Sequence, residues 1–97
     1  MTRKVETRAF DAADYLETPE QVAAFLDAAL DEGDAGVIAS ALGAIARARG
    51  MAAIAEETGL SREALYRSLS ADGNPTLSTL VSVLRVCDLR LRVAPVD

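Results

Sequence analysis

The sequence predicts one mainly α-helical domain of five helices that ends in a short β-strand. The 97 residues are enough for a single hydrophobic core. Apolar residues recur at spacings of three and four along most of the chain, which is the period of amphipathic helices. Hydrophobic residues make up 51% of the sequence and aromatic residues only 4%. The core must therefore consist of closely packed small and aliphatic side chains, and the abundant alanine favours helix over strand.

Residues 1–17 are expected to form an N-terminal arm that precedes a single helical domain over residues 18–97. The arm mixes charged residues with isolated apolar ones and shows no helical period. We expect it to be extended and to dock through its aromatic residues. Thr18 then supplies a capping hydroxyl, Pro19 suits the first helical position, and Gln21 completes a capping box. A helix should begin there.

The first two helices are predicted over residues 19–32 and between Asp34 and Gly50. The first has an amphipathic stripe that Gly33 ends, made of Val22, Phe25, Leu26, Ala29 and Leu30. The second is capped by Asp34 and has its own stripe of Ile38, Ala41, Leu42 and Ile45. Two arginines in its last turn, Arg47 and Arg49, oppose the negative end of the helix dipole.

Two short helices follow, and their spacing is typical of a helix-turn-helix over about residues 51–70. The helix over residues 51–58 is too short to be stable alone and must depend on packing. Gly59 permits the sharp turn, and Ser61 can cap the helix over residues 62–70. We expect that helix to bury itself through Leu60, Leu65 and Leu69.

The remaining chain is predicted to contain a turn, a fifth helix and a strand. In the turn SADGNP, either Asn74 or Thr76 can cap the following helix. We expect the apolar stripe of that helix to consist of Leu77, Leu80, Val81, Leu84 and Cys87. The sequence LRLRV, residues 89–93, then alternates with a period of two and predicts a strand. Such a strand needs a partner, which is either the N-terminal arm or the same strand of a second subunit.

The helix over residues 62–70 is a candidate DNA-reading surface. With Leu65 and Leu69 turned inward, its outward residues near the amino end are the ones that would enter a major groove. The arginines can donate to guanine, Glu63 can accept from cytosine, and Tyr66 can contact a thymine methyl group or a phosphate. Backbone amides at a helix start suit a phosphate. The complete candidate DNA-binding set is Ser61, Arg62, Glu63, Tyr66, Arg67, Asn74 and Thr76.

Structural interpretations of the same residues remain open. A solvated helical hairpin would show the same Arg, Glu and Tyr side chains. Arg47 and Arg49 fit helix-end charges better than phosphate ligands. Arg90 and Arg92 fit the solvated face of the strand, and Cys87 fits a small core residue.

The charge distribution is uneven along the chain. The formal net charge is −5, but residues 1–46 hold nine acidic and three basic side chains, whereas residues 47–97 hold six acidic and seven basic ones. The acidic cluster consists of Asp27, Asp31, Glu32 and Asp34. It is either a solvated face or a surface that attracts a basic protein.

Several classes of protein are not expected. The chain has no histidine and a single cysteine, so we expect no disulfide, no metal site and no cofactor. No pair of carboxylates is spaced for acid–base catalysis, so we expect no enzyme activity. Because no apolar run has the length of a signal peptide or a membrane span, we expect a cytoplasmic protein without membrane contact.

A family resemblance is carried by residues 46–93, above all by the motifs RGM, IAEETGLSREALYRSLS, DGNPT and LRLRV. This segment resembles the HigA-like antidotes (antitoxins) of bacterial addiction modules, which have an XRE or Cro/C1-type (lambda repressor-like) DNA-binding domain. A weaker match lies in the run FDAADYLETPEQVAAFLDAAL. Together the two segments cover nearly the whole chain.

The resemblance implies a homodimer that binds double-stranded operator DNA, represses its own operon and neutralises a toxin. Such toxins are typically small basic endoribonucleases of the RelE or HigB type. The base-reading surface implied by position is Ser61, Arg62, Glu63, Tyr66 and Arg67. One departure is that the chain ends four residues after Val93 without a long toxin-binding tail, so we expect the toxin to meet the folded body or the arm.

Two other functions are compatible with the same residues. One is a stand-alone phage-type transcriptional repressor that has no toxin. The other is a protein-interaction module whose helix over residues 62–70 contacts protein and never DNA.

Overall fold

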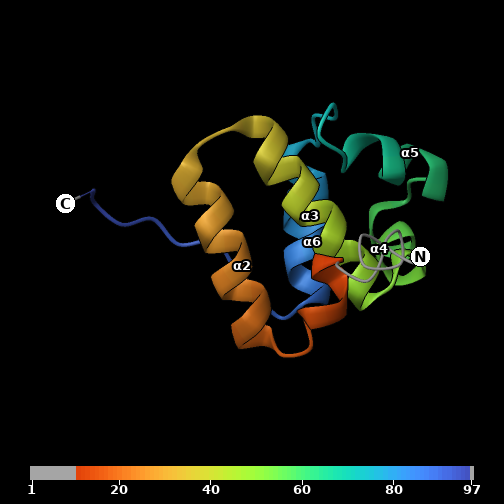
Figure 1. Cartoon of the computed structure of the whole chain (residues 1–97). Helices are drawn as coiled ribbons and strands as arrows, with labels where there is room; N and C mark the ends of the chain where they lie inside the picture. The colour runs from red at the N-terminus through yellow and green to blue at the C-terminus, as the bar shows by residue number, and fades with distance from the viewer. Residues whose placement is uncertain (1–10, 97) are drawn as a thin grey trace, which may run out of the picture.

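The computed structural model describes residues 11–96, and within them the chain is helical (Figure 1). A short 3-10 helix precedes five α-helices, as the sequence predicts for the helical part of the fold. In chain order the elements are η1 (Ala12–Tyr15), α2 (Pro19–Glu32), α3 (Ala35–Arg49), α4 (Met51–Thr58), α5 (Arg62–Ser68) and α6 (Leu77–Val86).

The expectation of an extended arm is wrong for its described part, and residues 1–10 lie outside the described chain. Asp11 caps the 3-10 helix by accepting a hydrogen bond from the Ala13 N–H at 3.1 Å. The residue that docks is Leu16, which is buried in the core, whereas Tyr15 is exposed. Leu16 docks because burial removes its wholly apolar side chain from water, whereas burial of Tyr15 would also remove a hydroxyl group from water.

Helix α2 begins and ends where the sequence predicts. The Gln21 N–H donates to the Thr18 hydroxyl oxygen at 3.1 Å, and the Gln21 side-chain oxygen accepts from the Thr18 N–H at 3.1 Å. Gly33 ends the helix in the left-handed conformation, with φ of 76°. Val22, Leu26 and Ala29 are buried, while Leu30 at the edge of the stripe is largely exposed.

Helix α3 is the central element of the core. An unbroken run from Ala41 to Ala46 is buried, because α2 covers one side of the helix and α6 another. Gly43 lies so close to the end of α5 that a Cβ atom there would overlap the Leu69 backbone carbonyl oxygen. The small residue Gly43 of α3 therefore sets how closely the end of α5 packs on the core.

The turn between α4 and α5 follows the prediction except at Leu60. Gly59 has φ of 76°, and the Thr58 hydroxyl accepts a hydrogen bond from the Leu60 N–H at 3.1 Å. Leu65 and Leu69 are buried as expected, but the side chain of Leu60 is 38% exposed. Leu60 lies in the turn before α5 begins and does not join the core cluster.

Helix α6 is rotated relative to the predicted stripe. Leu77 and Val81 are 77% and 41% exposed, which makes the predicted orientation wrong for both. Leu84 and Cys87 are buried as predicted, and Leu80 packs partly on the core. The other inward side chains are Thr79, Ser82 and Val83, which the predicted stripe does not include. Contacts with α4 and α3 fix this orientation, because Val83, Leu84 and Cys87 join the central core cluster.

The predicted C-terminal β-strand is not formed in the described chain. Residues 89–96 have no regular structure and pass beside α2 before projecting away from it (Figure 1). Asp88 reverses the chain with φ of 60°, and the Leu89 N–H donates to the Leu84 carbonyl oxygen at 2.8 Å. Leu89 packs on the core, but no neighbouring strand in residues 11–96 offers backbone partners to the rest of the segment.

None of the described helices is long and apolar enough by itself to cross a membrane. Helices α3 and α4 reach that length and composition only together, and a bend of 111° separates them.

Candidate nucleic-acid interface

The amino end of α5 is built by a capped turn. Ser61 adopts an extended backbone conformation, and its hydroxyl accepts a hydrogen bond from the Ala64 N–H at 3.0 Å. Glu63 lies in the first helical turn, where a carboxylate is favourable because the helix dipole is positive there. The cap fixes the direction in which α5 leaves the turn after Gly59.

The outward face of α5 carries the predicted base-reading residues. Leu65 is fully buried beneath them, so the helix has one orientation on the core. Tyr66 is 50% exposed, so its aromatic ring is not part of the core. The structure brings five predicted residues onto this exposed surface, namely Ser61, Arg62, Glu63, Tyr66 and Arg67.

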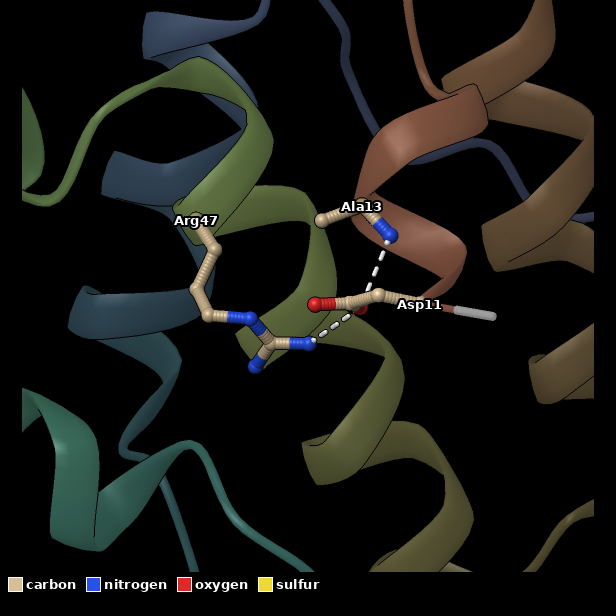
Figure 2. Close-up of polar contacts among 3 residues, drawn as sticks. All are labelled: Asp11, Ala13 and Arg47. Carbon is tan, nitrogen blue, oxygen red and sulfur yellow. Dashed lines mark hydrogen bonds and ion pairs between the residues drawn. The ribbon is translucent and has the colours of Figure 1, made fainter. Parts of the chain in front are cut away.

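The arginines of the chain differ in their partners. Arg47 forms an ion pair with Asp11 at 3.0 Å (Figure 2), and Arg85 forms one with Glu57 at 3.1 Å. Within residues 11–96, neither Arg62 nor Arg67 forms an ion pair. The two arginines of α5 are therefore not used to hold the described fold together.

A hollow beside the carboxyl end of α5 brings the remaining predicted residues together. This loop hollow, of about 430 Å³, is lined by Arg67, Asn74 and Thr76 among others. Of the two predicted caps for α6, Asn74 and Thr76, the structure has Thr76. Its hydroxyl accepts a hydrogen bond from the Thr79 N–H at 3.1 Å. Asn74 stays exposed at the rim.

Asp72 and Gly73 are among the residues of the loop hollow that were not predicted as site residues. A Cβ atom at Gly73 would overlap the backbone carbonyl oxygen of Ser68, so a glycine is needed where the loop passes under α5. Asp72 also lines the hollow, and its carboxylate weakens the attraction of this part of the surface for phosphate. The dipeptide Asp72-Gly73 signals the turn in the sequence, but not its close approach to α5.

The single cysteine has the environment of a core residue, as the sequence indicates. Cys87 is fully buried, and burial raises the pKa of its thiol above the usual 9.0, although the nearby Arg49 acts in the opposite direction. A thiol with a raised pKa is a poor nucleophile at neutral pH. Among the described residues, no three His, Cys, Asp or Glu side chains lie close enough together to hold a metal ion.

Comparison with known proteins places the chain in a family. A family model described as "probable addiction module antidote protein" matches residues 6–95. A protein of Haemophilus influenzae that is described as uncharacterized is 44% identical over 84 residues, which are 87% of this chain and 87% of that protein. No solved structure matches the chain significantly. The match over nearly the whole sequence shows that the chain belongs to the family of probable addiction module antidote proteins.

Proposed function

We propose that the chain is the antitoxin of a type II toxin–antitoxin module and that it binds operator DNA through α5 and represses its own operon. An antidote family implies a toxin partner. We assign the domain to the Cro/C1-type (lambda repressor-like) helix-turn-helix class and the toxin to the basic endoribonucleases of the RelE or HigB type. The protein acts in the cytoplasm, without enzymatic activity of its own.

The observation that supports DNA binding most strongly is the pair of arginines on α5. Arg62 and Arg67 are exposed and make no ion pair within residues 11–96, while Arg47 and Arg85 are paired with carboxylates. A surface arginine without a structural partner is available for bidentate hydrogen bonds to guanine or for phosphate contacts. In this proposal Tyr66 and Glu63 contact neighbouring bases, and Asn74 and the amides near Thr76 contact a phosphate.

A homodimer follows from the way such helices read DNA. Two recognition helices related by a two-fold axis contact half-sites about one helical turn apart, or about 34–36 Å. Exposed apolar residues on α6, Leu77 and Val81, offer a surface that a second copy can cover. The proposal places the dimer contact there.

The test of the repressor function is binding of the purified protein to its own promoter and to random DNA of equal length. At about 150 mM salt, non-specific phosphate binding is weak, so a repressor should prefer the promoter by about a thousandfold or more. Equal affinity for both duplexes would refute operator recognition. Co-purification with the product of the adjoining reading frame tests the toxin partner separately.

A further inference from the structure

A groove lies between α2 and α3 on a part of the molecule away from the outward face of α5. Its volume is about 740 Å³. It extends from Asp11 and Ala12 at the start of the described chain to Ala71 in the turn after α5. A groove of this size falls within the range of about 300–1,000 Å³ of pockets that enclose drug-sized ligands.

The groove exists because the facing residues of the two helices are small. Its floor is made largely of methyl groups, and larger side chains at these positions would fill the space between the helices. Phe25 and Val37 are only half-buried beside it. The alanines of α2 and α3 that line the groove are Ala28, Ala29, Ala41 and Ala44.

The rim of the groove carries net negative charge. Among residues 11–96, the only basic side chain that lines the groove is Arg47, which is bound to Asp11 at 3.0 Å (Figure 2). The Ala13 N–H and Arg47 both donate hydrogen bonds to the Asp11 carboxylate, and these bonds lower the pKa of that carboxyl below its usual 3.8. The remaining rim carboxylates, Glu32 and Asp34, make no ion pair within residues 11–96.

The surroundings of the groove extend this negative charge. Residues 11–46 include eight Asp and Glu residues and no Lys or Arg. A basic protein is attracted to such a surface before contact. On binding, its Lys and Arg side chains can replace bound water by ion pairs with the carboxylates at the rim. A negatively charged nucleic acid is repelled by the same surface.

We propose that this α2–α3 groove is the docking site of the toxin, and that its occupant is a cationic amphipathic segment of that protein. Apolar side chains of the segment rest on the alanine floor, and its Lys or Arg side chains pair with Glu32 and Asp34. The proposal rests on the function proposed above, since it needs a basic toxin. It identifies a surface distinct from the outward face of α5, so that DNA and toxin can be held at the same time.

The first test compares two double variants that remove the same amount of charge. Glu32→Gln with Asp34→Asn neutralises the rim, and asparagine still caps α3. Asp27→Asn with Asp31→Asn neutralises two acids of α2 that do not line the groove. The probe is the product of the adjoining reading frame, titrated against each purified variant. We expect the rim variant to lose about tenfold or more in affinity, while the control stays within about threefold of the wild type.

A second test fills the groove without changing charge. Ala28 lines the groove and is exposed, so Ala28→Leu should reduce toxin affinity by steric blocking. Ala23 is exposed on another face of α2, and Ala23→Leu is its matched control. Both variants should keep wild-type promoter binding and melting temperature, which shows that the fold is intact.

The possible outcomes separate this inference from the function on which it rests. If the wild type binds no product of the adjoining frame, the antitoxin function itself fails. If the wild type binds it and both groove variants match their controls, the groove proposal is overturned and the function stands. Loss of self-association instead of toxin binding would assign the groove to a second copy.

Discussion

At the scale of single residues, the arginines of this protein are found in two different settings. Arg47 and Arg85 join elements that are distant in the sequence, by pairing with Asp11 and Glu57. Arg67 is exposed beside the loop hollow and can contact a ligand. Exposed ion pairs contribute only about 0–1 kcal/mol to stability, so the fold tolerates their loss, whereas DNA recognition depends strongly on each base contact.

Substitution of Arg67 by alanine should weaken operator binding at a single base pair. If the guanidinium reads a base edge, we expect a loss of about 1–3 kcal/mol that disappears when that base pair is replaced. The measurement is a titration of wild type and variant against a set of promoter duplexes with single substitutions. A uniform loss over all duplexes would reassign Arg67 to a phosphate contact.

Substitution of Gly43 by alanine should destabilise the fold. Alanine usually stabilises a helix interior by about 0.5–1 kcal/mol relative to glycine, but here its Cβ atom would overlap the Leu69 carbonyl oxygen. We expect a net loss of about 1–3 kcal/mol in the free energy of unfolding, measured by urea denaturation. Ser40→Ala, at an exposed position of α3, is the control and should change little. A stabilised Gly43→Ala variant would show that α3 and α5 are not in close contact.

At the scale of elements, helices marked by local signals were predictable and the orientation of α6 was not. The boundaries of α2 depend on neighbours in the sequence, namely the capping box at Thr18 and the glycine at position 33. In α6, Leu77, Leu80, Val81 and Leu84 also form a consistent stripe. Packing against α4 and α3 selects a face that keeps Leu84, and Leu80 in part, but exposes Leu77 and Val81 and buries the small polar residues Thr79 and Ser82. That choice depends on residues more than twenty positions away.

The exposed face of α6 leads to a prediction about the dimer. Replacing Leu77 and Val81 by glutamate should dissociate the proposed dimer without unfolding the monomer, because the two residues are 77% and 41% exposed. Position 77 is also in the first turn of α6, where the helix dipole favours a carboxylate. Sedimentation equilibrium of wild type and variant measures the effect. The control replaces Val93 and Val96 by glutamate as well; both valines are almost fully exposed in the C-terminal segment. If the control dissociates the dimer and the α6 variant does not, the interface lies in that segment.

The C-terminal segment shows where a local pattern was misleading. LRLRV alternates with the period of a strand, but a strand is stable only when its backbone groups are paired. In the described chain the segment lies against the side chains of α2, and Leu89 alone packs on the core. The alternating pattern of LRLRV gives no information about whether a second strand is present to pair with its backbone.

At the scale of the whole molecule, the acidic helix α2 and the face of α5 that we propose to bind DNA lie at different ends. Helix α2, with four carboxylates, and helix α5 lie on opposite sides of α3 (Figure 1). The turn between α4 and α5 could be predicted because Gly59, Ser61 and Leu65 act locally. The α2–α3 groove could not, since it depends on how closely two helices approach and on which acids stay unpaired.

Amide hydrogen exchange on the two complexes probes this division between the ends of the molecule. We predict that promoter DNA slows exchange in α5 and in residues 72–76, and that the toxin slows exchange in α2 and α3. Each ligand should leave the other region at its free rate. Protection of α2 by DNA, or of α5 by the toxin, would contradict this prediction.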